Sequence, residues 1–128
     1  MADAGNSGLF AEANGVGSVE AAVYARMTTT QLAPGESDDW VTVFESIVPV
    51  CRQLDGFKGM IIASEDEGQR VLVMSLWESE ETLAAGKPVM DSLRDAETRR
   101  RKVESQETTS FRVVGFDIRW LSTQALGG

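Results

Sequence analysis

The side chains that could hold a ligand in this chain are few, and two of them lie close together near its beginning. Tyr24 and Arg26 belong to a stretch rich in Val, Tyr, Met and Thr, a composition that predicts a strand. A phenol and a guanidinium can both donate hydrogen bonds to a phenolate or a carboxylate of a ligand. Tyr and Arg are also common at interfaces, so a place at a dimer seam or a sheet edge is the alternative.

Apolar side chains of the kind that line a ligand pocket are more numerous. Trp77 closes an apolar strand and could stack on a planar ligand, although large indoles often serve packing alone. The other pocket candidates are Phe44, Met60, Met74 and Met90. A flexible thioether suits an adaptable pocket and equally fills gaps in a core. Trp40 begins a helical apolar stripe, and we expect it in the core.

The usual catalytic and metal-binding groups are missing. The sequence has no histidine, which removes the most common general base. It also lacks HExxH, CxxC, a glycine-rich phosphate loop and a Ser-His-Asp set. The single cysteine, Cys51, lies on an apolar stripe without a neighbouring cation, so we interpret it as a structural thiol. We therefore expect no metal and no cofactor.

Two charged runs have a simpler interpretation than a binding site. Arg99-Arg100-Arg101-Lys102 follows Asp95 and Glu97 by about one helical turn, so opposite charges can pair along a solvated helix face. A phosphate or carboxylate site on this run is the alternative. Glu65-Asp66-Glu67 precedes Gly68 in a hairpin turn, where three carboxylates serve solubility.

Size and charge limit the possible partners. A chain of 128 residues is long enough for one domain with a modest core. A net charge of −8 argues against binding to nucleic acid or to an anionic membrane. The single cysteine, the lack of a membrane-length apolar run and the absence of signal-peptide features predict a cytoplasmic protein.

The first half of the chain predicts a strand followed by a helix. Residues 1–18 are mostly small and polar, and we expect a flexible tail before a domain over 19–121. A strand over 19–32 and a turn over 33–36 lead to a helix that begins at Ser37-Asp38-Asp39 and carries an apolar stripe to Leu54. Pro49 predicts a kink or a change of helix type, and Gly56 predicts the helix end.

The second half predicts two strands, a broken helix and a last strand. Strands over 58–64 and 71–77 flank the hairpin turn, and the second is apolar on both faces. Ser79 predicts a helix start, strengthened by two glutamates in the first turn. Gly86-Lys87-Pro88 predicts an interruption, with a restart at Pro88 that runs to about Val103. The last strand is expected over 108–118, and residues 122–128 form a short tail.

This order predicts an α+β protomer of the ferredoxin-like βαββαβ type with an antiparallel sheet. Two helices can cover only one face of a four-stranded sheet, yet three of the predicted strands are apolar on both faces. The other face needs a cover, and a second copy of the chain is the simplest source. We therefore expect a homodimer that associates through its sheet face.

Two segments that connect predicted elements resemble the antibiotic biosynthesis monooxygenase family, whose members form dimeric α+β barrels. They are Leu54-Asp55-Gly56-Phe57 after the first helix and Leu76-Trp77-Glu78-Ser79-Glu80-Glu81-Thr82-Leu83 between the third strand and the second helix. The resemblance covers about residues 20–118. It implies a homodimer with a ligand pocket between each sheet and its helices. It also implies an activity such as cofactor-free oxidation of phenolic polyketides, quinol oxidation or haem degradation.

The haem-degrading branch of that family uses residues that this chain does not have. Its axial histidine is absent, and its first-strand asparagine corresponds to Ala25. Many members carry Trp or His nine residues beyond the strand-ending Trp, where this chain has Gly86. We expect neither tight haem binding nor haem degradation.

Two functions are compatible with the sequence. One is a cofactor-independent monooxygenase or related oxidoreductase acting on a small aromatic or quinol-type ligand, with Tyr24, Arg26 or Trp77 as hydrogen-bond donors. The alternative is a non-catalytic dimeric ligand-binding or assembly module that kept the fold and lost the active site. Ala25 and Gly86 favour the second, whereas the fold favours the first only by analogy.

Overall fold

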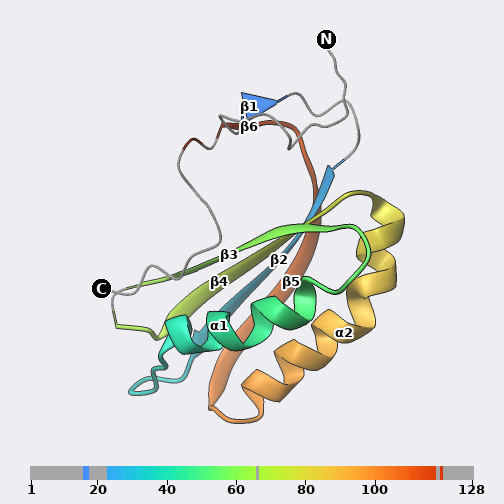
Figure 1. Cartoon of the computed structure of the whole chain (residues 1–128). Helices are drawn as coiled ribbons and strands as arrows, with labels where there is room; N and C mark the ends of the chain where they lie inside the picture. Colours follow the sequence, from blue (N-terminus) through green and yellow to red (C-terminus); the bar gives the residue numbers. More distant parts are fainter. Residues whose placement is uncertain (1–15, 18–22, 66, 118, 120–128) are drawn as a thin grey trace.

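The computed structural model describes residues 16–17, 23–65, 67–117 and 119, and it has two layers (Figure 1). One layer is a four-stranded antiparallel sheet of β2 (Val23–Leu32), β3 (Phe57–Ser64), β4 (Arg70–Trp77) and β5 (Val103–Val113). Helices α1 (Trp40–Cys51) and α2 (Glu80–Thr98) cover one face of this sheet. The strand order β3-β4-β2-β5 is that of the ferredoxin-like α+β fold, which confirms the predicted fold class.

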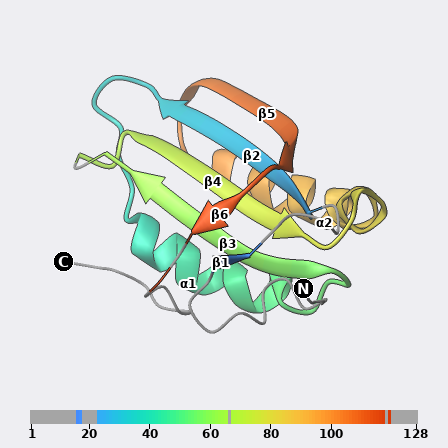
Figure 2. The same cartoon turned by 90° about the horizontal axis from the view of Figure 1, so that it is seen from above.

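A second, two-stranded sheet stands on the opposite side. Strand β1 (Val16–Gly17) pairs with β6 (Phe116–Asp117), and Figures 1 and 2 place this pair on the helix-free side of the large sheet. Val16–Gly17 belongs to the segment expected as a flexible tail. The rest of that segment, the predicted strand residues 19–22 and the tail over 122–128 lie outside the described residues.

Both helices begin at a polar cap. The Asp39 carboxylate accepts hydrogen bonds from the backbone N–H groups of Val41 (3.2 Å) and Thr42 (3.4 Å) at the start of α1. Ser79 and Thr82 form a reciprocal capping box at the start of α2, with each side chain accepting from the other residue's backbone N–H at 3.1 Å. The helix start predicted at Ser79 is confirmed.

The interruption predicted in the second helix is wrong, because α2 is one continuous helix of 19 residues with Pro88 inside it. Pro88 cannot donate to the carbonyl of Ala84, but both residues lie on the exposed side of the helix, where water can satisfy that carbonyl. Helix α1 likewise continues through the exposed Pro49 without a change of helix type.

The predicted helix ends and the last strand need correction as well. Helix α1 ends at Cys51 rather than near Leu54, and α2 ends at Thr98 rather than Val103. Strand β5 begins at Val103, five residues earlier than predicted, because it pairs with β2 along the whole of that strand. It ends at Val113, and of the predicted remainder only β6 is a described strand.

The strand registers assign each side chain to a face of the sheet. Directly paired residues of antiparallel strands point to the same face, so Arg26, Ser75 and Met60 share the helix-facing side. Met27, Met74 and Ile61 share the other side by the same rule. The buried core on the helix side contains Trp77, Cys51 and Met90, with Leu54, Phe57, Met60, Leu83 and Leu93 packed against them. Neither described helix is long and apolar enough to cross a bilayer.

Candidate functional site

A cavity of about 70 Å³ lies between the helix-facing side of the sheet and the two helices. Its helix side carries the apolar Val43 and Ile47 from α1 and Met90 and Leu93 from α2, and further along α2 the polar Arg94, Glu97 and Thr98. Its sheet side combines the apolar Leu32, Val71 and Val73 with four polar residues. These polar residues, Arg26, Thr28, Thr30 and Ser75, are each at most 7% exposed and form the polar floor of the cavity.

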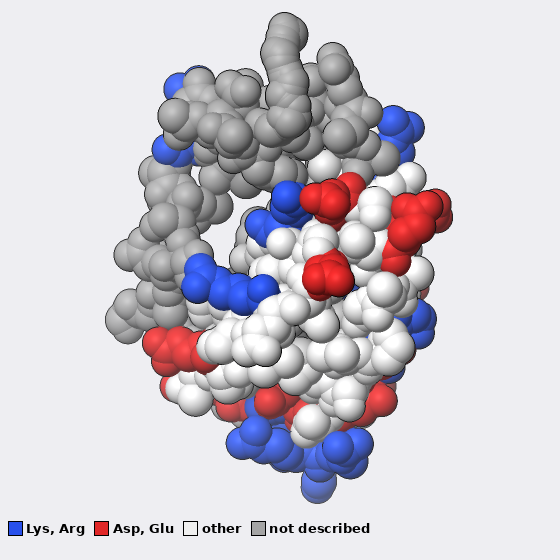
Figure 3. All heavy atoms as spheres, turned by 45° about the vertical axis from the view of Figure 1, so that its right-hand side comes forward, with Lys and Arg blue, Asp and Glu red and all other residues white. Residues whose placement is uncertain are grey.

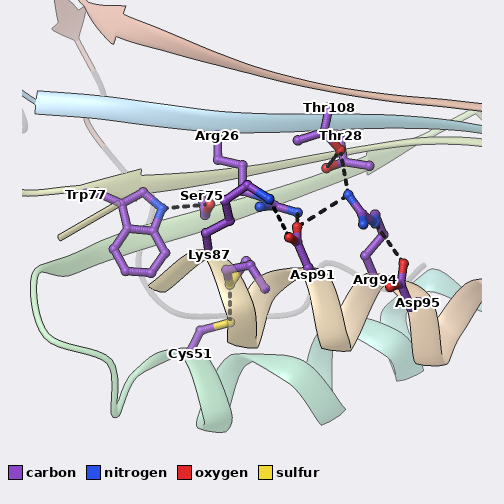
Figure 4. Close-up of polar contacts among 11 residues, drawn as sticks. Arg26, Thr28, Cys51, Ser75, Trp77, Lys87, Asp91, Arg94, Asp95 and Thr108 are labelled. Atoms are coloured by element: carbon purple, nitrogen blue, oxygen red, sulfur yellow. Dashed lines mark hydrogen bonds and ion pairs between the residues drawn. The ribbon is translucent and has the colours of Figure 1, made fainter. Parts of the chain in front are cut away.

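Two hydroxyl groups of this polar floor accept hydrogen bonds from N–H donors. The indole Nε1 of Trp77 donates to Ser75 Oγ at 2.9 Å (Figure 4). The amide of Gln106 on β5 donates to Thr30 Oγ1 at 3.0 Å. Thr28 Oγ1 lies 2.9 Å from Thr108 Oγ1 on β5. An indole N–H can only donate, so the Ser75 oxygen must be the acceptor in its pair, and the Ser75 hydroxyl proton points elsewhere.

Arg26 reaches from β2 across to α2. Its Nη2 donates to Asp91 Oδ1 at 2.7 Å, and its side chain is 5% exposed (Figure 4). Asp91 also accepts from Lys87 Nζ at 2.6 Å and lies 3.4 Å from Arg94 Nη1. One carboxylate therefore has three cationic neighbours, and Arg26 shares its only described partner with two other side chains.

This surplus of cations sets the charge state of Asp91. The hydrogen bond from Lys87 lowers the pKa of Asp91 most. The hydrogen bond from Arg26 and the charges of Arg26 and Arg94 lower it further. Together they outweigh the effect of burial and lower the pKa of Asp91 from 3.8 to about 2. Asp91 is thus a firmly ionised partner for Arg26 and a weak proton acceptor.

Trp40 and Arg101 also line the cavity. Trp40 donates its indole N–H to the carbonyl of Gly68 at 2.8 Å, and the Arg101 guanidinium lies over the Trp40 ring at 5.0 Å from its centre. Arg101 also pairs with Asp38 and with Glu97, the latter at 3.0 Å. These contacts join the start of α1, the β3–β4 hairpin and the end of α2.

Arg101 corrects the interpretation of the basic run as a solvated helix face. Its side chain is only 6% exposed, whereas Arg100 is 71% exposed. Figure 3 shows Lys and Arg side chains gathered where α2 meets β5, and the exposed residues of the run there are Arg99, Arg100 and Lys102. The local sequence does not predict the burial of Arg101, because its partner Asp38 lies 63 residues earlier in the chain.

The matched part of the chain identifies the family. Residues 23–85 match the family model described as antibiotic biosynthesis monooxygenase, a segment that contains β2, α1, β3, β4 and the beginning of α2. The chain carries an antibiotic biosynthesis monooxygenase domain. A search of curated proteins finds no match to the sequence.

Solved structures share the fold of this antibiotic biosynthesis monooxygenase domain. Protein SO0527 from Shewanella oneidensis has a TM-score of 0.59 at 15% identity, over 76% of this chain and 96% of that chain. NE2512, a protein of unknown function from Nitrosomonas europaea, has a TM-score of 0.59 at 12% identity, over 84% and 98%. The ActVA-Orf6 monooxygenase of Streptomyces coelicolor, in complex with nanaomycin D, has a TM-score of 0.52 at 14% identity, over 77% and 94%.

The seven predicted pocket residues do not lie together in this antibiotic biosynthesis monooxygenase domain. Arg26 and Met90 line the cavity. Tyr24 is half-buried on the same face as Arg26, where it pairs with Trp77 in the register, and it does not line the cavity. Trp77 and Met60 belong to the adjoining core, Phe44 is half-buried on α1, and Met74 faces the helix-free side. The residues that line the cavity without having been candidates include Trp40, Ser75 and Arg101.

Packing against Trp77 explains why position 86 is a glycine. The Trp77 side chain is fully buried, and a Cβ added at Gly86 would lie 2.6 Å from the indole Cη2. A glycine at this position lets α2 approach β4 across the ring. Phe57 meets the same indole edge to face, with ring centres 5.6 Å apart. Trp77 thus fills the space beside Gly86 from within the protomer.

Ala25 and Cys51 do not line the cavity. Ala25 alternates with Arg26 along β2 and therefore points to the helix-free side of the sheet. Cys51 is fully buried, and its thiol donates to the Met90 sulfur at 3.6 Å. Burial raises the pKa of Cys51 to about 11, so this thiol remains protonated, as expected of a structural cysteine. The described residues contain no group of three or more potential metal ligands.

Proposed function

We propose that this chain is a cofactor-independent monooxygenase that binds a small phenol or quinol in the cavity between its sheet and its helices. The observation that carries the proposal is the buried guanidinium of Arg26 beneath an apolar wall. A cation in such a place stabilises a phenolate, and the apolar wall accepts the ring. The fold shared with the ActVA-Orf6 monooxygenase, whose structure holds nanaomycin D, supports a small-molecule oxygenase.

The reaction balances without a cofactor if the substrate supplies the electrons. A phenol with a free ring position and one O₂ give a quinone and one water. One oxygen atom enters the ring, and the other leaves as water with the two displaced hydrogens. The protein's part is to favour the electron-rich phenolate through Arg26 and to keep bulk water away from the ring.

An oxygen-uptake assay tests this function. We expect a panel of hydroxylated one-ring and two-ring aromatics to contain a substrate whose oxidation consumes O₂ in proportion to enzyme. Arg26→Met should lower kcat/KM by about 100-fold, the effect of losing a buried charged contact to the reacting group. Arg100→Met removes an exposed cation of the same kind and should leave kcat/KM unchanged. Equal activity of Arg26→Met and the wild type would contradict the assignment.

We also propose that two copies associate through the helix-free face of the sheet, as is typical of the family. That face carries Met27, Met74 and Leu72, and its two edge strands expose Ile61 (38%) and Phe111 (46%). Exposed apolar side chains of this kind are often covered by a partner in a soluble protein. The buried, unpaired Cys51 is compatible with the reducing cytoplasm in which we place the protein.

A non-catalytic binding module is the second candidate, and one observation favours it. The carboxylates beside the cavity, Asp91 and Glu97, are each held by two or more arginine or lysine side chains. The lowered pKa of Asp91 makes this carboxylate a weak proton acceptor for a phenol. A ligand that binds the cavity and is not oxidised in the uptake assay would select this candidate.

A further inference from the structure

We propose that the cavity takes the charged oxygen of a small acid, a carboxylate or phenolate that carries at most one ring, and that Arg26 and Ser75 bind this oxygen. The inference rests on the proposed function, because it names the ligand class of the same cavity. It adds Ser75 as a binding residue, Trp77 as the residue that positions Ser75, and an upper limit to the size of the ligand.

Ser75 supplies a hydrogen-bond donor without an acceptor. The residue is 1% exposed and lines the cavity. Its oxygen accepts from the indole N–H of Trp77, and no described residue accepts its hydroxyl proton. Buried donors nearly always have a partner, so a donor that faces a cavity points to an acceptor atom within that cavity.

Arg26 supplies further donors of the same kind. Of its five N–H bonds, the described contacts occupy only the Nη2 group, through Asp91. The Arg26 side chain lines the cavity and is shielded from bulk water, since it is 5% exposed. A buried cation with unused donors favours an anionic acceptor over a neutral one.

The two donors lie side by side. Arg26 and Ser75 are direct partners in the register of β2 and β4, so both side chains leave the sheet on the helix side at the same level. Asp91 does not cancel the charge of Arg26 alone, because it also pairs with Lys87 and Arg94. The cavity therefore offers a hydroxyl and a guanidinium to one oxyanion.

The volume of the cavity limits the size of the group attached to the charged oxygen. A cavity of about 150 Å³ is known to hold a benzene ring. The cavity here measures about 70 Å³, so the charged group fits and a single ring already requires a small movement of the helices away from the sheet. A second fused ring requires a larger movement, which weakens binding.

Trp77 acts through Ser75 rather than on the ligand. It is fully buried and does not line the cavity, but its N–H fixes the Ser75 oxygen as an acceptor. The hydroxyl proton is thereby directed away from the indole. Replacing the indole by a phenyl ring frees the hydroxyl to rotate, which costs binding without removing any group that touches the ligand.

Calorimetric titration of the full chain with three probes tests the ligand class. We expect saturable binding of benzoate with one site per chain. Benzamide has the same shape without the charge, and 2-naphthoate has the same charge with a second ring. Each should bind about tenfold more weakly than benzoate or worse. Benzamide or 2-naphthoate binding as tightly as benzoate would overturn the charge or the size assignment, respectively.

Two serine variants locate the site. Ser110 on β5 is the other direct partner of Arg26 in the register, but it is exposed and does not line the cavity. Ser75→Ala should weaken benzoate binding about tenfold, and Ser110→Ala should not change it. Both substitutions are small and keep the strand intact, so the thermal unfolding of each variant should remain cooperative. Equal benzoate affinity in Ser75→Ala and the wild type would overturn the role of Ser75.

A double-mutant cycle separates the positioning role of Trp77 from a structural one. Trp77→Phe should weaken benzoate binding several-fold in the wild type and have no effect in the Ser75→Ala background. A merely structural role would weaken binding equally in both. Failure of the oxygenase proposal appears as benzoate binding without oxidation of any phenol, whereas failure of this inference appears as no preference for benzoate over benzamide.

Discussion

At the scale of single residues, the position of Asp91 explains how a buried arginine can be tolerated beneath two helices. A guanidinium removed from water needs a hydrogen-bonded counter-charge, and Asp91 provides it at 2.7 Å from the facing helix. Lys87 and Arg94 hold the same carboxylate from positions one turn away on α2. The site therefore keeps Arg26 charged and fixed by a carboxylate, Asp91, that does not itself line the cavity.

The pH dependence of stability should report this arrangement. The folded protein holds the pKa of Asp91 at about 2, below its ordinary 3.8, so Asp91 contributes stability that is fully present well above 3.8. That contribution is lost as the pH falls from 3.8 through about 2. Asp91→Asn should lower the free energy of unfolding at pH 7 by about 2 kcal/mol, since it leaves Arg26 without its carboxylate.

Urea unfolding at a series of pH values measures this difference. The gap between the wild type and Asp91→Asn should shrink as the pH approaches the lowered pKa of Asp91, because the protonated carboxyl then resembles the amide. Asp95→Asn, at a position where the side chain is 52% exposed, should leave stability nearly unchanged throughout. A gap that stays constant down to the lowest pH would show that Asp91 does not act through its charge.

The sequence predicted Arg26 as a candidate residue but not its surroundings. A guanidinium in a strand is visible in the local sequence, whereas its partner Asp91 lies 65 residues later. Ser75 carries no signal, since a serine in an apolar strand looks like a tolerated small residue. Its role depends on the indole N–H of Trp77 two residues on and on the helices that close over both. Such information is tertiary and is not present in local spacing.

At the scale of elements, the distance between α2 and β4 is set by one glycine and one tryptophan. Gly86 is buried in the first half of α2, and the Trp77 ring occupies the space that any larger side chain would need. The local sequence Gly-Lys-Pro predicted a helix break for the ordinary reasons of propensity. Packing on the tryptophan overrides that propensity, while Pro88 lies on the exposed side, where its missing N–H costs little.

Gly86→Ala should therefore destabilise the protein although alanine is the better helix former. The new Cβ would lie 2.6 Å from Cη2 and 2.9 Å from Cζ3 of Trp77, so the ring or the helix must move. We expect a loss of about 2 kcal/mol in the free energy of unfolding, typical of an overpacked core. Gly59→Ala is the control, because a Cβ there meets no atom within 4 Å.

The double variant Trp77→Phe with Gly86→Ala tests the cause. The smaller ring leaves space for the methyl group, so the cost of Gly86→Ala should fall to well under half in that background. An equal cost in both backgrounds would mean that the strain arises elsewhere in α2. Urea denaturation of the four proteins of the cycle gives the coupling directly.

The strongly periodic elements and the polar helix caps could be predicted from the sequence, whereas the first part of the edge strand β5 could not. Ser79, its two following glutamates and the two-sided apolar strand β4 carry local signals that the structure confirms. The first part of β5 has no such signal, because residues 104–107 are polar and exposed on an edge strand. Its strand conformation follows from pairing with β2, which the local sequence does not encode.

At the scale of the whole molecule, the two faces of the sheet have different uses. The helix side holds the core and the cavity, and the helix-free side presents Ile61 and Phe111 on its two edge strands. The order of elements and the two-sided apolar strands allowed the fold class and this division to be predicted. Which small molecule enters the cavity could not be predicted, since it depends on donors that only the folded chain brings together.

Sedimentation velocity tests the proposed use of the helix-free face. We expect the wild type to sediment as a dimer at micromolar concentration. The double variant Ile61→Glu with Phe111→Glu places two charges on that face and should sediment as a monomer. Val50→Glu is the matched control, because Val50 is 41% exposed on α1 and should leave the dimer intact. A wild-type monomer at that concentration would rule out the proposed dimer.

The most direct test of the proposed site is a crystal structure of the full chain soaked with 4-hydroxybenzoate, a single-ring acid that combines the proposed charge and the phenol. We predict ligand density between the sheet and the helices, with a ligand oxygen within hydrogen-bond distance of both Arg26 and Ser75. Ligand density on the helix-free face of the sheet, or a cavity that holds only water at a saturating concentration of the acid, would contradict the assignment.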